Sequence, residues 1–303
     1  MIDIENISIT TLSENSVADV GFIAEWGFSA HVAIQGGSTI LFDTGNGLAC
    51  THNAEAAGIR LADVDKIVLS HGHADHTGGL RPVLQKINRD QPRKTGIDIF
   101  CHQAAIESQH VKRGDQYLFM GCPHHLEELE QLGANFNTGS DPVWISKDIV
   151  TSGEVPMTTE FESVAPICFL KTAQGYVNSP VDDDQALFLI TSRGLIIILG
   201  CAHRGMINTI RHARKITGVD EVYLVIGGTH LLNTTTDQQE ATLAAIEELG
   251  VKKIGVSHCT GMRAASFLYH RLGSKRFFFN NAGTKVTFRE GKIAVKAFET
   301  YDV

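Results

Sequence analysis

The chain has 303 residues, of which 43% are hydrophobic and 20% are charged, and its formal net charge is −8 at pH 7. A chain of this composition can bury a sizeable core, which excludes a disordered or low-complexity protein. The negative charge argues against a nucleic-acid partner, and the longest apolar run, residues 195–199, is far too short to cross a membrane. The six cysteines form no Cys-x-x-Cys pair and the amino terminus lacks a basic region followed by an apolar stretch, so we expect a cytoplasmic protein.

The N-terminal half predicts mainly short strands. Apolar patterning indicates two early strands and a hairpin around Gly36 and Gly37. One more strand precedes, and another follows, a helix that starts near Leu80. In chain order these strands cover residues 6–11, 21–24, 31–35, 39–42, 66–69 and 97–101. Between about residues 104 and 162, glycines and prolines interrupt any periodicity, so we expect an insertion or lid there.

The C-terminal half alternates strands with helices more regularly. Gly218 and Gly250 are expected to end two helices, and the spacing of Asp237 and Glu240 is typical of a capping box at the start of the second helix. The predicted strands cover residues 186–191, 195–199, 222–226 and 253–256.

A dense cluster of metal-ligand residues follows the strand at residues 66–69. Within six residues the chain places His71, His73, Asp75 and His76. Imidazole nitrogen and carboxylate oxygen suit zinc, iron or manganese. Four such groups exceed what one tetrahedral ion usually takes from a single loop, so we expect two divalent ions with a water or hydroxide between them.

Histidines also follow the ends of four apolar strands, at His71, His203, His230 and His258. In open α/β sheets, ligands bind at the carboxyl ends of the strands. The sequence therefore predicts that function lies along one edge of the sheet.

The spacing His-x-His-x-Asp-His, followed by Thr77, Gly78 and Gly79, resembles the signature of the metallo-β-lactamase superfamily. Further segments occur in the order of one branch, which is named for 7,8-dihydropterin-6-yl-methyl-4-(β-D-ribofuranosyl)aminobenzene-5′-phosphate synthase. These segments are residues 26–29, 42–45, 183–186, 200–203, 227–231 and 257–261. The resemblance implies an α/β (α+β) fold, a single-domain four-layer αββα sandwich over residues 1–303, with two metals at one edge of its paired sheets.

The resemblance also implies a ligand set, from which this chain departs twice. Superfamily hydrolases supply a third histidine to the first metal from just before the hairpin at residues 186–199, where this chain has only Asp182, Asp183 and Asp184. His203 is then the candidate to replace that histidine. A bridging aspartate is expected where Cys201 stands, so either this thiolate bridges the ions or Cys201 is a buried inert cysteine.

Further roles are expected for His258, which matches the superfamily's final histidine, and for residues around the predicted ions. His258 is expected to bind the second metal, and Asp43 is expected to accept a hydrogen bond from a ligand histidine. We assign Asp75 to orienting the nucleophile, and His203 or His230 to proton transfer.

Three residues are candidates for binding the substrate. Arg204 and Arg263 lie close in sequence to strand-end motifs, and a guanidinium group binds phosphate or carboxylate well. His230 is a candidate substrate contact as well as a candidate ligand.

Together these features predict a metal-dependent hydrolase with two ions, zinc before iron or manganese. It would act on an anionic small molecule, such as a phosphoester or a pterin-related compound. An iron-dependent redox enzyme and a non-catalytic ligand-binding protein are the alternatives. We expect no nucleic-acid or membrane partner, and self-association into a homo-oligomer stays open.

Overall fold

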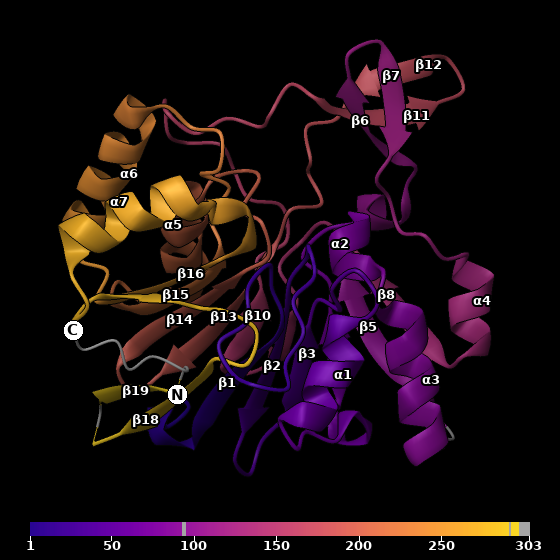
Figure 1. Ribbon diagram of the computed structural model, residues 1–303, viewed down its shortest axis with the longest axis horizontal. Coiled ribbons are helices and arrows are strands. Elements are labelled where there is room, and N and C mark those ends of the chain that lie inside the picture. The colour runs from indigo at the N-terminus through magenta and orange to yellow at the C-terminus, as the bar shows by residue number, and fades with distance from the viewer. Residues whose placement is uncertain (93–94, 291, 297–303) are drawn as a thin grey trace.

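Two β-sheets face each other in the computed structural model, and helices cover their outer faces (Figure 1). The structure describes residues 1–92, 95–290 and 292–296. The four layers are those of an αββα sandwich, so the expected fold is confirmed. None of the described helices is long and apolar enough to span a membrane.

The eight-stranded sheet contains the first and the last strands of the described region. Its order is β19 (Lys292–Lys296), β18 (Lys285–Arg289), β1 (Ile7–Ser13), β2 (Ser29–Ile34), β3 (Thr39–Phe42), β4 (Lys66–Val68), β5 (Ile97–Cys101) and β8 (Ala134–Thr138). Its outer face packs on α1 (Ala49–Ala56), α3 (Leu80–Asp90) and α4 (Leu126–Gln131). The short helix α2 (Ala74–Thr77) lies within the predicted metal loop.

The seven-stranded sheet is formed mainly by the C-terminal half. Its order is β17 (Phe277–Phe279), β16 (Lys253–Ser257), β15 (Val222–Gly228), β14 (Gly194–Leu199), β13 (Ala186–Thr191), β10 (Ile149–Thr151) and β9 (Trp144–Ser146). The helices α5 (Met206–Thr217), α6 (Thr236–Glu248) and α7 (Met262–Leu272) cover its outer face. Single 3-10 turns are η1 (Ile4–Asn6), η2 (Leu61–Asp63), η3 (Gln103–Ile106) and η4 (His258–Thr260).

The pleat of the strands divides the hydrophobic core between layers. In β13, Phe188 points toward α5 and its neighbouring helices, whereas Leu187 and Leu189 point toward the other sheet. Because successive side chains of a strand point to opposite faces, a strand buried on both sides is apolar throughout. This explains the continuous apolar runs in the two strands of the hairpin at residues 186–199.

A third, smaller sheet projects from the sandwich (Figure 1). Its order is β12 (Gly175–Asn178), β11 (Cys168–Thr172), β6 (Gln109–Arg113) and β7 (Gln116–Phe119), and we call it the projecting sheet. The segment 104–162 therefore is not one separate unit. It supplies two strands to the projecting sheet, while β8, β9 and β10 pair with strands of the two main sheets.

Two local predictions were wrong. Residues 21–24 form no strand, because the side chain of Asn53 satisfies the backbone N–H and carbonyl of Ile23 in place of a neighbouring strand. Helix α6 is capped by Thr235, whose hydroxyl accepts from the Gln238 N–H at 3.2 Å, so Asp237 already lies inside the first turn. The other predicted strands and helices are present, with ends shifted by a few residues.

Candidate metal centre

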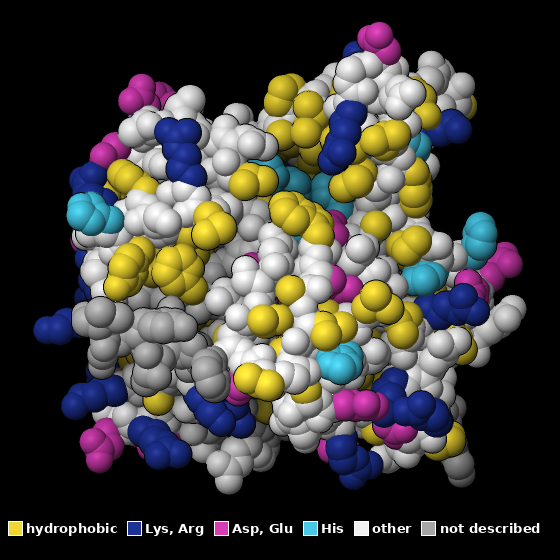
Figure 2. Space-filling view, in the orientation of Figure 1, with side chains coloured by type: hydrophobic (Ala, Val, Ile, Leu, Met, Phe, Trp, Pro, Cys, Tyr) yellow, Lys and Arg dark blue, Asp and Glu magenta, His cyan; other side chains and the backbone are white. Residues whose placement is uncertain are grey.

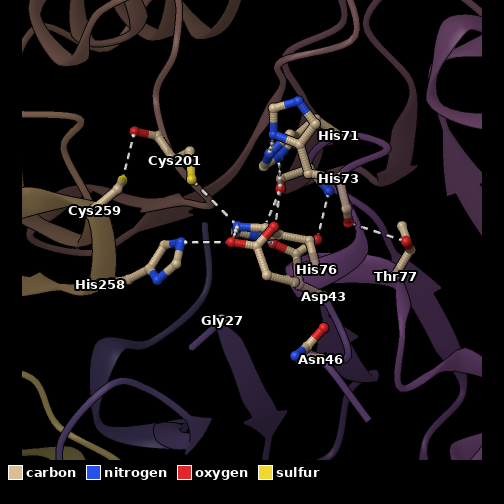
Figure 3. Close-up of polar contacts among 12 residues, drawn as sticks. Gly27, Asp43, Asn46, His71, His73, His76, Thr77, Cys201, His258 and Cys259 are labelled. Carbon is tan, nitrogen blue, oxygen red and sulfur yellow. Dashed lines mark hydrogen bonds and ion pairs between the residues drawn. The ribbon is translucent and has the colours of Figure 1, made fainter. Parts of the chain in front are cut away.

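The carboxyl ends of three strands bring the predicted ligands together. His71, His73, Asp75 and His76 follow β4, Cys201 and His203 follow β14, and His258 follows β16. All seven residues are buried. Figure 3 shows most of them converging from the two halves of the sandwich onto one small region.

The first ligand group consists of His71, His73 and His203. The Nε2 atom of His71 lies 3.0 Å from Nδ1 of His73 and 3.2 Å from Nε2 of His203. Burial, reinforced by the neighbouring imidazoles, lowers the pKa of His71 and of His203 well below the usual histidine value. These rings are therefore neutral at pH 7, and neutral imidazole is the form that binds a metal ion.

The second ligand group consists of Asp75, His76 and His258. The Oδ2 atom of Asp75 lies 3.2 Å from Nε2 of His258 and 3.9 Å from Nε2 of His76. The other carboxylate oxygen, Oδ1 of Asp75, is buried and has no hydrogen-bond partner among the described residues. A buried carboxylate oxygen without a partner is costly, and a bound cation would satisfy it.

Cys201 lies between the two groups. Its Sγ atom is 3.2 Å from Nε2 of His76, and it forms possible ligand sets both with His71 and His76 and with His258 and Cys259. Burial raises the pKa of the Cys201 thiol well above its usual value. A metal ion beside the sulfur would reverse this effect, because a coordinating thiol loses its proton.

Cys259 is a ligand candidate that the sequence prediction missed. Its Sγ atom lies 3.3 Å from both the Cys201 carbonyl and the His230 N–H. Its position directly after His258 was a usable signal, because a residue next to a strand-end ligand also lies at the sheet edge.

Asp43 supports both halves of the metal loop. Its Oδ2 atom accepts from His76 Nδ1 at 2.7 Å, and its Oδ1 atom accepts from the Ser70 N–H at 2.7 Å. The Ser70 hydroxyl donates to Asp43 Oδ2 and lies 2.8 Å from His71 Nδ1. With Nδ1 of His76 donating its proton to Asp43, Nε2 of His76 is left to face Asp75 and Cys201. Although burial lowers the pKa of His76, the nearby Asp43 and Asp75 carboxylates outweigh this effect and raise the pKa to about 9.

Strained backbone surrounds this arrangement. The non-glycine residues Asp43, Ala202, His230 and His258 adopt positive φ angles of 52° to 55°. Such conformations cost free energy and concentrate at functional sites. Gly200 has no room for a side chain, because a Cβ atom there would lie 2.0 Å from the Ser70 hydroxyl oxygen.

Two loop residues that no sequence motif marks, Glu14 and Asn15, orient His258. Its backbone N–H donates to Glu14 Oε1 at 2.6 Å, and its Nδ1 atom lies 2.9 Å from Asn15 Oδ1. The ring of Trp26 meets the imidazole edge-on, at 5.0 Å between centroids. Nothing in residues 14–15 distinguishes them from other polar loop residues before the fold is known.

The three aspartates before β13 support the site from outside the ligand groups. Asp183 Oδ2 accepts from the Gly72 N–H at 2.8 Å, which holds the metal loop, and Asp184 Oδ2 accepts from the Arg204 N–H at 2.9 Å. Burial raises the pKa of Asp184 to about 7. Asp182 pairs with the Arg204 guanidinium. Where superfamily hydrolases have a further histidine, this chain thus has aspartates that hydrogen-bond to the neighbouring loops. His203 is instead part of the first ligand group.

A cavity of about 530 Å³ opens above the ligands. Its lining includes the ligand residues His73, Asp75, Cys201, His203 and His258, together with residues of the projecting sheet. Figure 2 shows histidine side chains in the hollow beside this sheet, with hydrophobic side chains around them. The volume is typical of a small-molecule site.

Of the three predicted substrate contacts, the structure brings His230 to this cavity. Its ring centroid lies 4.2 Å from that of His203. Arg204 is turned away, because its guanidinium contacts the Val155 and Pro180 carbonyls and Asp182. Arg263 is exposed beside Thr236 and is absent from the described lining. Closeness in sequence to a strand end did not fix the direction of either arginine side chain.

The ligand groups fit a metal centre by their chemistry. Neutral imidazoles, a carboxylate with a buried oxygen lacking a partner, and a thiol are brought together at the floor of a cavity. Nitrogen, oxygen and sulfur donors in such a set suit a transition metal ion.

Comparison with known proteins gives the same result. A family model described as the metallo-beta-lactamase superfamily matches residues 26–90. The 7,8-dihydropterin-6-methyl-4-(beta-D-ribofuranosyl)-aminobenzene-5'-phosphate synthase of Methanocaldococcus jannaschii is 33% identical over 269 residues, which are 86% of this chain and 90% of that protein.

Solved structures with the same fold extend this finding. The crystal structure of a metal-dependent hydrolase of the beta-lactamase superfamily matches with a TM-score of 0.76 and 27% identity, covering 92% of this chain and 98% of the other. The metallo-beta-lactamase fold protein YhfI from Bacillus subtilis, at 11% identity and a TM-score of 0.56 over 92% of this chain and 98% of its own, shares the fold. The chain therefore belongs to the metallo-beta-lactamase superfamily of metal-dependent enzymes.

Proposed function

We propose that this enzyme is a hydrolase that holds two divalent metal ions and cleaves an anionic small molecule. The observation that carries the proposal is the presence of two separate ligand groups side by side at the floor of one cavity. His71, His73 and His203 would hold one ion, Asp75, His76 and His258 the other, with Cys201 between them. Histidine, carboxylate and thiolate donors together favour zinc over manganese, and iron is the next candidate.

Two adjacent ions, when bound, lower the pKa of a water molecule to about 7 and offset negative charge that develops on the substrate. The side chains supply the rest of the chemistry. The Asp75 carboxylate, which belongs to the second ligand group, would also orient the attacking water. His203 belongs to a ligand group, so proton transfer to the leaving group falls to His230, which lines the cavity beside it.

The substrate class is supported by the cavity and by one relative. A volume of about 530 Å³ suits a small molecule rather than a polymer chain. The relative from Methanocaldococcus jannaschii is named for a product that contains a dihydropterin, an aminobenzene and a sugar phosphate. We therefore favour a phosphoester or a pterin-related compound as the substrate of this enzyme.

The test combines metal analysis with turnover in a matched pair of variants. Protein purified without chelators or a metal-affinity column should contain about two zinc ions per chain by elemental mass spectrometry, and should hydrolyse bis(4-nitrophenyl) phosphate or 4-nitrophenyl phosphate. His73→Ala should abolish hydrolysis and lower the metal content together. His270→Ala is the control, because this histidine is exposed on α7.

Each outcome bears on the proposal. Hydrolysis that survives in His73→Ala at the wild-type rate would overturn it. Iron in place of zinc, with a redox reaction and no hydrolysis, would favour the redox enzyme instead.

A further inference from the structure

We propose that Arg113 is an anion-binding residue on the wall that the projecting sheet contributes to the cavity. It would bind a phosphate, sulfonate or carboxylate group on a substrate that has an apolar, ring-sized body. The inference rests on the proposed function and deepens it, because it names the part of the enzyme that selects the substrate.

The pleat of β6 turns Arg113 toward the cavity. Val111 and Arg113, two residues apart on this strand, both line it. Lys112 lies between them and therefore points to the opposite face, where its Nζ atom is 5.6 Å from the ring centroid of Tyr117. Two neighbouring cations of one strand thus lie on opposite faces of the projecting sheet.

Arg113 has no acidic partner within ion-pair distance among the described residues. By contrast, Arg204, Arg271 and Arg276 each contact a carboxylate. Arg113 is also the only lysine or arginine in the described lining of the cavity. A guanidinium group left free on the wall of a cavity presents two parallel N–H donors to an anion, and such bonds are stronger than neutral ones.

Besides Arg113 and the ligand residues, the described lining of the cavity contains partly exposed apolar side chains and the polar residues Ser163, Asn233, Thr234 and Gln238. Trp26, Ile167 and Leu232 line the cavity with 51%, 47% and 45% of their surfaces exposed. Exposed hydrophobic side chains gathered in a cavity indicate a ligand with apolar surface. Figure 2 shows hydrophobic and basic side chains of the projecting sheet around the hollow that holds the histidines.

These observations define the shape of the ligand. Trp26 contacts His258 edge-on, so the apolar wall begins at the metal centre. The projecting sheet supplies Val111 and Arg113, and Met120 directly follows its strand β7. A substrate that fills this space places its reacting group on the ligand residues, an apolar ring on Trp26 and Leu232, and a separate anionic group on Arg113.

A matched pair of probes tests this inference without turnover. Benzenesulfonate carries a negative charge and is a weak metal ligand, whereas methyl phenyl sulfone is a neutral compound of similar shape. Binding of each to the metal-loaded full-length protein can be measured by quenching of tryptophan fluorescence and by calorimetry. We expect the wild type to bind the sulfonate more tightly than the sulfone.

The variants separate a specific contact from a general charge effect. Arg113→Gln should weaken sulfonate binding about tenfold or more and leave sulfone binding unchanged, because one charge-assisted contact is lost. Arg113→Lys should fall between the two, since it keeps the charge but not the two parallel donors. Lys112→Gln removes the same charge one residue away and should leave both affinities at the wild-type value.

Equal sulfonate affinity in the wild type and Arg113→Gln would overturn the inference. So would equal losses in Arg113→Gln and Lys112→Gln, or equal affinity of the wild type for both probes. Because binding is measured without hydrolysis, failure here is distinct from failure of the proposed function, which the metal content and turnover of His73→Ala decide.

Discussion

The sandwich and the projecting sheet of this enzyme differ in how far their side chains are buried. The sandwich packs three layers of core side chains that are almost wholly excluded from solvent, such as Phe188 at 0% exposure. The projecting sheet packs aromatic rings on one exposed face, where Tyr117 and Tyr176 stack at 3.9 Å and Phe119 is 53% exposed.

The two regions also differ in what they contribute to the site: the sandwich holds the metal ligands, and the projecting sheet faces the space for a substrate. The metal ligands are fixed by strand ends and by buried hydrogen bonds to Asp43, Asn15 and Asp183, which hold their atoms in place. The projecting sheet has mostly exposed residues in β7 and β12, and it lines part of the cavity. We infer that the sandwich determines the reaction, and that changes in the projecting sheet alter which molecule is bound.

The largest expected contrast is in stability. Phe188→Ala should lower the free energy of unfolding by about 3–5 kcal/mol, because it leaves a cavity in the core that the helices cannot fill. Phe119→Ala removes a ring of the same size from the exposed face of the projecting sheet, and should cost about 1 kcal/mol or less. Urea unfolding followed by circular dichroism measures both. Similar losses in the two variants would contradict the comparison.

A second prediction concerns the buried support of the metal loop. Asp43→Asn keeps the size of the side chain but removes the negative charge of the carboxylate, whose oxygens accept from His76 Nδ1 and the Ser70 N–H. We expect metal affinity, measured by competition with a chelator, to fall about 10- to 100-fold, and turnover to fall with it. Benzenesulfonate binding at Arg113 should change much less.

Asp63→Asn provides the control for this change, since Asp63 is an exposed carboxylate in η2, before β4. It should leave metal affinity unchanged. If Asp43→Asn binds metal as tightly as the wild type, Asp43 does not position His76.

The ligand residues were predictable because their chemistry is local in the sequence. His71, His73, Asp75 and His76 follow a single strand, and the pattern at residues 70–79 is specific. His203 and His258 were predictable from topology, because parallel strands place their carboxyl ends at one edge. The apolar strands of the sandwich were predictable for a related reason, since burial on both faces leaves a continuous apolar run.

Arg113, Glu14 and Cys259 show what such patterns leave out. The role proposed for Arg113 depends on the pairing of β6 with β7 and β11, and both β6 and β7 lie in the segment 104–162, which has no clear periodicity. Glu14 meets His258 across more than two hundred residues, so no local signal marks it. Arg204 illustrates the opposite error, because its position beside a ligand suggested a substrate contact while its side chain binds the protein itself.

The smallest expected effect is a pH dependence that arises inside the sandwich. His31 on β2 is 8% exposed, and burial, aided by the charge of Lys285 and opposed by that of Asp63, lowers its pKa to about 4. In the unfolded chain the pKa is about 6.5, so between pH 6.5 and 4 the unfolded state binds a proton that the folded state does not. His31 therefore favours the folded state fully above pH 6.5, and this contribution is lost as the pH falls toward 4. Between pH 7.5 and 5.5 the loss should be about 1 kcal/mol, and His31→Gln should remove it, whereas the exposed His270→Gln should not. Urea unfolding at the two pH values measures the difference, and an unchanged pH dependence in His31→Gln would show that the interior of this sheet admits the charged imidazole.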